Sequence, residues 1–180
     1  MLKAVIFDMD GVLADTEPLH EKSRDVLLAR LGLDVAALSP RAYAKSKREY
    51  WAEVATECAL PQTAEQLTQI EFGILIEIIE NSRLQPNAGV KEALEALRAE
   101  GLSAAVASSS DRVYVETVLR VTGLEKFFDA TACGNEVAAA KPAPDVYLKA
   151  LQLLGVSAGE AVAVEDSDTG AKATVAAHLL

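Results

Sequence analysis

The sequence predicts an α/β protein in which a doubly wound parallel sheet is interrupted by an inserted bundle of helices. Three observations support this fold class. Short apolar runs alternate with helical patterns over the second half of the chain, and one further apolar run lies at the start. Between them, residues 16–84 carry helical patterns with almost no strand signal. Alternating strands and helices are typical of a parallel sheet with helices on its faces.

The strands are predicted from short apolar runs, as expected for strands buried in a parallel sheet. The run KAVIF at Lys3–Phe7 is β-branched and ends abruptly in acidic residues. The runs at Leu102–Ala107 and Ala161–Val164 are equally clear, whereas Asp129–Cys133 carries a weaker pattern. The carboxyl ends of these strands should form the ligand-binding edge of the sheet.

Three helical patterns lie among these strands, and each is followed by a glycine, which commonly ends a helix. They cover Val90–Glu100, Val113–Thr122 and Val146–Leu154. Because strands and helices alternate, the crossovers should be right-handed.

Residues 16–84 are expected to form a separate helical domain. Glu17–Leu31 has a proline in its first turn and a glycine after its end, as helices often do. A second helix opens at Thr63 with a capping-box pattern, and its apolar residues Leu67, Ile70, Ile74 and Ile78 share one face. The stretch Ser39–Cys58 is also expected to be helical. The core would then comprise residues 1–15 and 85–180.

The composition excludes several classes of protein. With 51% hydrophobic residues, the chain can bury a globular core. No apolar run approaches the roughly 20 residues that span a bilayer, and the first is too short for a signal peptide, so we expect a cytoplasmic protein. Cys58 and Cys133 are interpreted as reduced thiols. The net charge of -10 opposes general binding to nucleic acid, which is itself a polyanion.

Two pairs of acidic residues follow predicted strands. Asp8 and Asp10 come after the first strand, and Glu165 and Asp166 come after the last. Four carboxylates at one sheet edge would repel one another unless a cation lies among them, and Mg²⁺ prefers such oxygen ligands. The simpler interpretations are an acidic turn for the first pair and helix N-terminal acids for the second.

A hydroxyl and an ammonium group lie at the same edge. Ser108, with Ser109 beside it, ends the run LSAAVA and could hold phosphate oxygens, although a helix N-cap is an equally good interpretation. Lys141 precedes the proline-stiffened loop PAPD and could neutralise a phosphoryl group together with a carboxylate. Most loop lysines are simply solvated.

In this order, the four groups resemble the four motifs of haloacid dehalogenase-like phosphotransferases. FDMDGVLADTEPLH at residues 7–20 resembles the opening of β-phosphoglucomutase-like enzymes and related phosphatases with a helical cap. VASSS, KPAPD and VEDSDTGA match the remaining motifs, so the resemblance covers nearly the whole chain.

The resemblance implies a role for each of these residues. Asp8 would attack phosphorus and form an aspartyl-phosphate, and Asp10 would be the general acid and base. Mg²⁺ would be bound by the Asp8 carboxylate, the backbone carbonyl of Asp10, and Asp166, with Glu165 binding it directly or supporting these ligands. Ser108, Ser109 and Lys141 would hold the phosphoryl group.

The inserted helices would form the cap that selects the substrate. His20 occupies the place of a histidine that supports the acid-base residue in related enzymes, although a helix-surface histidine is an equal alternative. Arg48 belongs to a basic cluster with Arg41, Lys45 and Lys47, and aligns with an arginine that binds substrate phosphate in the mutases. A solvated helix face is the alternative for this cluster.

The expected activity is hydrolysis of a small phosphorylated metabolite by a monomer or weak homodimer. A mutase must also bind a second phosphate, and Asp111 stands where such mutases carry a lysine. Because a carboxylate there should weaken binding of that phosphate, a sugar-phosphate mutase is the second hypothesis. The family continues well beyond Gly170, so the resemblance implies that the C-terminal part of the core is truncated. A third hypothesis is therefore that the chain is a non-catalytic remnant or an interaction module.

Overall fold

The computed structural model describes residues 1–43 and 45–179, and its internal contacts divide the chain into two compact units. The core unit comprises Met1–Thr16 and Arg83–Leu180, and the cap unit comprises Glu17–Ser82. These boundaries lie within two residues of the expected ones. Ala44, in the expected helical stretch Ser39–Cys58, and Leu180, at the expected shortened end, lie outside the described residues.

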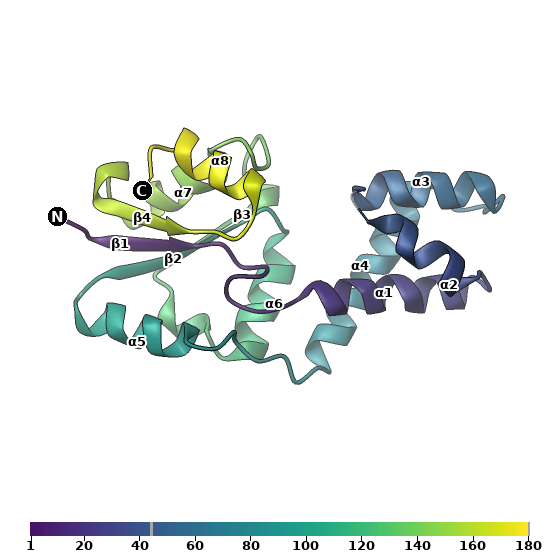
Figure 1. Cartoon of the computed structure of the whole chain (residues 1–180), viewed down its shortest axis with the longest axis horizontal. Coiled ribbons are helices and arrows are strands. Elements are labelled where there is room, and N and C mark those ends of the chain that lie inside the picture. The colour runs from purple at the N-terminus through teal and green to yellow at the C-terminus, as the bar shows by residue number, and fades with distance from the viewer. Residues whose placement is uncertain (44, 180) are drawn as a thin grey trace. The chain divides into compact units, whose positions relative to one another are not determined.

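The core unit contains one sheet of four parallel strands, which confirms the predicted fold class (Figure 1). The strand order is β3-β2-β1-β4, so β1 lies inside the sheet, between β2 and β4. In this register Phe7 lies opposite Val106 of β2 and Val164 of β4, so β1 and β4 end side by side and β2 continues to Ser108. The strands are β1 Ala4–Phe7, β2 Ser103–Ser108, β3 Ala130–Cys133 and β4 Ala161–Val164.

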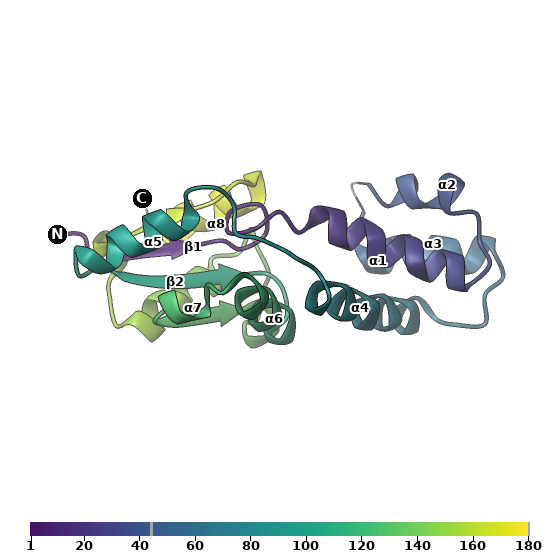
Figure 2. The same ribbon diagram turned by 90° about the horizontal axis from the view of Figure 1, so that it is seen from below.

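Helices cover both faces of this sheet, with α5 and α6 on one face and α7 and α8 on the other (Figures 1 and 2). On the second face, Ile6 and Ala105 pack in one buried cluster with Tyr147 and Ala173. As predicted, α6 and α7 each end at a glycine in the left-handed conformation. The helices are α5 Val90–Ala99, α6 Arg112–Thr122, α7 Asp145–Leu154 and α8 Asp168–Ala176, with 3₁₀ turns at η2 Glu125–Phe127, η3 Gly134–Glu136 and η4 Ala158–Glu160.

The cap unit is a helical bundle with its own buried core, which includes Leu28, Trp51 and Leu67. The predicted capping box at Thr63 is present, whereas Ile70, expected on the buried face of its helix, is 41% exposed. Its elements are α1 Glu17–Arg30, α2 Val35–Leu38, η1 Ser39–Ala42, α3 Lys47–Glu57 and α4 Ala64–Glu80. Among the helices described in the two units, none is long and apolar enough to cross a bilayer.

Candidate active site

Asp8 is the first residue after β1, and its carboxyl group is largely buried. The backbone N–H of Asp8 donates to the carbonyl of Val164, 2.9 Å away, and this bond continues the pairing of β1 with β4. Because the strand ends lie side by side, residues that follow β4 come close to Asp8. The sheet therefore brings the two predicted acid pairs to one edge.

Lys141 lies between two of these carboxylates. Its Nζ is 2.5 Å from Asp8 Oδ1 and 2.5 Å from Glu165 Oε1. The ammonium group also lies 4.9 Å from the centre of the Tyr147 ring, and the Tyr147 hydroxyl donates to Glu165 Oε1 at 2.6 Å. All three charged side chains are at most 12% exposed, so they interact with little screening by water.

The two carboxyl groups respond differently to this environment. Burial raises the pKa of Asp8 to about 6, even though the charge and hydrogen bond of Lys141 act to lower it. Burial also acts to raise the pKa of Glu165, but hydrogen bonds from Lys141 and Tyr147 outweigh it and the pKa is lowered. Of these two carboxylates, Asp8 is the one whose charge the surrounding residues balance less well.

Asp8, Glu165 and Asp166 converge in a way that fits a divalent cation. One carboxylate oxygen from each lies within 4.8 Å of the others. Gly11, with φ at +79°, lets Asp166 approach the turn after β1, since a Cβ there would lie 1.9 Å from Asp166 Oδ2. Three carboxylates against the one ammonium group of Lys141 leave an excess of negative charge, which a hard, oxygen-ligated cation would neutralise.

The Asp10 carboxylate is held by hydroxyl groups. Its Oδ1 accepts from Thr16 Oγ1 at 2.5 Å and from the Tyr114 hydroxyl at 2.7 Å, and its Oδ2 accepts from Ser110 Oγ at 3.4 Å. The cluster of three converging carboxylates described above does not include it. A metal contact through the Asp10 backbone carbonyl stays a prediction.

The two predicted phosphate-binding serines differ in exposure. Ser108 ends β2, is 1% exposed, and its Oγ accepts the backbone N–H of Ser110 at 3.1 Å. Ser109 is exposed, and its backbone lies so close to Gly134 that a Cβ at Gly134 would come within 2.0 Å of the Ser109 carbonyl oxygen. The Ser108 hydroxyl therefore organises the turn after β2, which lies beside Asp8.

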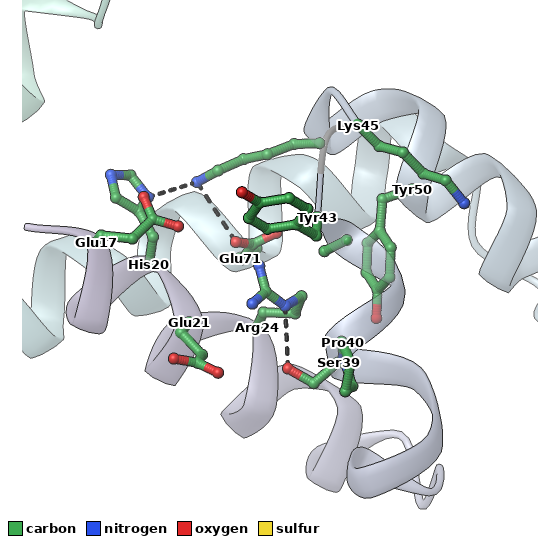
Figure 3. Close-up of a pocket in the computed structure, with 12 residues that line it drawn as sticks. Glu17, His20, Glu21, Arg24, Ser39, Pro40, Tyr43, Lys45, Tyr50 and Glu71 are labelled. Carbon is green, nitrogen blue, oxygen red and sulfur yellow. Dashed lines mark hydrogen bonds and ion pairs between the residues drawn. The ribbon is translucent and has the colours of Figure 1, made fainter. Parts of the chain in front are cut away.

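The two predicted cap residues, His20 on α1 and Arg48 in the first turn of α3, differ in whether they line a cavity. A cavity of about 840 Å³ in the cap unit is lined by His20 and Lys47, whereas Arg48 is exposed and is absent from the described lining (Figure 3). Lys47 Nζ lies 3.1 Å from His20 Nδ1 and 3.4 Å from Glu71 Oε1. Glu71 is buried and also accepts from Trp51 Nε1 at 2.6 Å. Of these two neighbouring cations, Lys47 is the one at the cavity.

Several residues at the site were not singled out from the sequence. Thr16 and Tyr114 bond Asp10, Tyr147 bonds Glu165, and Gly170 leaves room for Glu165, since a Cβ at Gly170 would lie 1.9 Å from that carboxyl carbon. Thr16 and Gly170 fall inside the quoted motifs, which was a usable signal. Tyr114 and Tyr147 fit the pattern of ordinary buried helix residues. The sequence around them gives no sign of the contacts that their hydroxyl groups make.

The fold and the site together indicate a class of enzyme. Its features are a parallel α/β core, a cluster of carboxylates at the carboxyl edge of the sheet, and a helical insertion after the first strand. A family model described as haloacid dehalogenase-like hydrolase matches residues 2–178, and the chain belongs to this family. The family predicted from the motifs is thereby confirmed, and the chain is an enzyme.

Individual relatives agree with this assignment. The chain is 33% identical to Protein CbbY of Rhodobacter capsulatus, over 99% of this chain and 83% of that protein. It is 32% identical to Hexitol phosphatase B of Escherichia coli (strain K12), over 98% of this chain and 80% of that protein. A crystal structure described as a putative beta-phosphoglucomutase from Thermotoga maritima superposes with a TM-score of 0.86 at 31% identity, covering 99% of this chain and 82% of that one. Such relatives support phosphohydrolase activity.

Proposed function

We propose that the chain is a magnesium-dependent phosphatase that hydrolyses a small phosphorylated metabolite through a phosphorylated Asp8. The observation that carries this proposal is the contact of the Lys141 ammonium group with Asp8, inside a cluster of three converging carboxylates. A carboxylate nucleophile needs positive charge beside it when it meets an anionic phosphate ester. Lys141 supplies part of that charge, and the acidic cluster offers a place for the rest.

The residues of the core unit divide the reaction between them. An Asp8 oxygen forms a bond to phosphorus while the bond to the leaving oxygen breaks, and Asp10 gives its proton to that oxygen. Water then attacks phosphorus, Asp10 takes the proton from it, and Asp8 leaves as a carboxylate with release of inorganic phosphate. Lys141 and Ser108 hold the oxygens of the phosphoryl group.

Mg²⁺ is proposed as the cofactor, held by Asp8, Asp166 and the Asp10 backbone carbonyl. Glu165 is proposed to support these ligands, because its two oxygens already accept hydrogen bonds from Lys141, Tyr147 and Ser167. When bound, the ion supplies positive charge that offsets the charge of the carboxylates and the phosphate. A hard cation suits this set of oxygen ligands.

A sugar or polyol monophosphate is the proposed substrate class. The lining of the cap cavity carries both charges, and its lysines already have acidic partners: Lys47 pairs with Glu71 and Lys45 with Glu53. Such a lining suits the hydroxyl groups of a polyol better than a second phosphate. The similarity to Hexitol phosphatase B points to the same class.

A sugar-phosphate mutase is the second candidate, favoured by the similarity to the structure described as a putative beta-phosphoglucomutase. Asp111 weighs against it, because its exposed carboxylate stands at the start of α6, where such mutases carry a lysine. A carboxylate there would repel a second phosphate group. Hydrolysis needs no second phosphate site.

The test is a panel of polyol phosphates, sugar phosphates, nucleotides and an aryl phosphate, assayed for inorganic phosphate with Mg²⁺ and with EDTA. Turnover should require Mg²⁺, favour polyol or sugar phosphates, and disappear in Asp8→Asn. The control is Asp129→Asn, at the start of β3, whose carboxylate accepts the N–H of Ala104 at the opposite edge of the sheet. Turnover in EDTA, or an active Asp8→Asn variant, contradicts the mechanism, and isomerisation without phosphate release would establish the mutase.

The same panel separates the two cap cations. Lys47→Met should raise the KM for the preferred polyol phosphate, whereas Arg48→Met should leave it unchanged if only cavity residues contribute. A raised KM in Arg48→Met alone would instead support the residue chosen by alignment. Pairing Lys47→Met with Glu71→Gln avoids leaving a buried carboxylate without its cation.

A further inference from the structure

We infer that Tyr114 is a positioning residue that determines which oxygen of Asp10 exchanges a proton with the substrate. The inference rests on the proposed function, because it concerns the general acid and base of that reaction. It uses contacts within the core unit alone.

The two carboxylate oxygens of Asp10 accept different numbers of hydrogen bonds, of different lengths. Oδ1 accepts two hydrogen bonds, from Tyr114 at 2.7 Å and from Thr16 at 2.5 Å. Oδ2 accepts a longer bond, at 3.4 Å, from Ser110 Oγ. A carboxylate oxygen has about two lone-pair directions, so the two hydroxyl donors fill the hydrogen-bonding capacity of Oδ1.

This inequality places the exchanged proton on Oδ2. A proton on Oδ1 would meet two hydroxyl hydrogens already directed at the same atom. In the first step, the Oδ2–H bond of Asp10 breaks and its proton goes to the leaving oxygen, which keeps the electron pair of the broken P–O bond. In the second step Oδ2 takes a proton from water, and Oδ1 accepts the same two hydrogen bonds throughout.

Tyr114 is suited to fix this orientation because its ring is held by the core. It is the third residue of α6, its side chain is 1% exposed, and the next residue, Val115, is fully buried. A buried aromatic ring has few rotamers open to it, so its hydroxyl stays in one place. Asp10 lies in the turn after β1, and Tyr114 ties that turn to a helix 104 residues further along the chain.

The test compares two substrates whose leaving groups differ in their need for a proton. An alkoxide leaving from a polyol phosphate needs a proton from Asp10, whereas nitrophenolate leaving from p-nitrophenyl phosphate does not. Tyr114→Phe keeps the ring and removes the hydroxyl. We expect kcat/KM for the polyol phosphate to fall about tenfold, part of the full effect of general acid catalysis, while kcat/KM for p-nitrophenyl phosphate changes less than about twofold.

Thr122→Val is the matched control, because it removes another buried hydroxyl from α6. Within the described residues, this hydroxyl donates to the helix backbone, at the carbonyl groups of Val118 and Leu119. It should leave the ratio of the two kcat/KM values unchanged. Thr16→Val removes the other donor to Oδ1 and should reproduce the selective loss, which keeps the inference testable if Tyr114→Phe folds poorly.

The possible outcomes distinguish the role of Tyr114 from the proposed phosphatase function. Equal loss for both esters, or loss for neither, in an active enzyme overturns the role of Tyr114 and leaves the proposed phosphatase intact. A wild-type protein that turns over neither ester overturns the proposed function, and the inference with it.

Discussion

At the scale of single residues, Asp8 shows a conflict between reactivity and stability. Its carboxyl group is buried, and burial raises its pKa to about 6 although Lys141 donates to it. The folded protein therefore holds a charged group that would be better solvated in the unfolded chain. Such a cost in stability is expected if Asp8 is the nucleophile proposed above, because a nucleophilic carboxylate must stay charged although it is partly shielded from water.

This conflict predicts a pH-dependent gain in stability for Asp8→Asn in the absence of metal. In the unfolded chain the Asp8 pKa is near 3.8, so between that value and about 6 the folded state binds more protons. Stability contributed by this residue is therefore present below about pH 4 and is lost as the pH rises to about 6. Asparagine does not titrate and escapes this loss.

Urea denaturation in EDTA measures this difference. At pH 7.5, Asp8→Asn should be more stable than the wild type by on the order of 2 kcal/mol, and at pH 4 the two proteins should be nearly equal. Adding Mg²⁺ at pH 7.5 should stabilise the wild type and narrow the gap. The same difference at both pH values would mean that Asp8 carries no such penalty.

At the scale of helices and strands, the sequence predicts what depends on local pattern. The apolar runs mark the strands because a parallel strand is buried on both faces, and glycines mark the ends of α6 and α7 because they adopt positive φ. The exposed Ile70 departs from its pattern, because burial on a bundle helix depends on which neighbours cover each face. That information is not local.

The residues of the candidate site also fall into two groups: those that a local pattern predicts and those that it does not. Asp8, Lys141 and Asp166 could be found from motifs, since each follows a strand or precedes a helix in a characteristic loop. Tyr114 could not, because its role is a hydroxyl contact across 104 residues of sequence. Which of Lys47 and Arg48 lies at the cavity could not be predicted either, since one position on a helix turns a side chain by about 100°. The proposed role of Arg48 stays a prediction.

Helix α8 yields a prediction at this scale, because Gly170 in its first turns leaves space for Glu165. A Cβ there would lie 1.9 to 2.0 Å from the Glu165 carboxyl group, which Lys141 and Tyr147 hold in place. Gly170→Ala should therefore displace Glu165 and lower kcat/KM by about tenfold or more, since small displacements at a site are costly. The gain in helix propensity, at most about 1 kcal/mol, should offset part of any loss of stability.

Gly73 provides the control, because it lies within α4 and a Cβ there would meet nothing within 4 Å. Gly73→Ala should raise the free energy of unfolding by up to about 1 kcal/mol and leave kcat/KM unchanged. Steady-state kinetics and urea denaturation of both variants measure these effects. An undiminished kcat/KM in Gly170→Ala would show that the position of Glu165 is not critical.

At the scale of the whole molecule, the chain consists of two units that each have a buried core. The residues that would bind metal and phosphoryl group all belong to the core unit, whereas the single tryptophan, Trp51, is buried in the cap unit. Fluorescence of Trp51 therefore reports on one unit, while circular dichroism reports on both. These two probes make it possible to locate the effect of a ligand.

A thermal melt followed with these two probes tests the hypothesis that the chain is a non-catalytic remnant. Beryllium fluoride with Mg²⁺ mimics a phosphoryl group on a carboxylate, so a site already assembled around Asp8 should bind it and a loosened one should not. At a concentration 100 times the dissociation constant, binding adds about 2.7 kcal/mol, which for a chain of this length corresponds to a rise of roughly 5 to 10 °C in Tm. We expect this rise in the wild type and none in Asp8→Asn. The shift should be larger by circular dichroism than by Trp51 fluorescence, because the ligand contacts core-unit residues.

A wild-type Tm that beryllium fluoride and Mg²⁺ leave unchanged would mean that the three carboxylates and Lys141 do not form a working site. The hypothesis of a non-catalytic remnant would then replace that of a phosphatase.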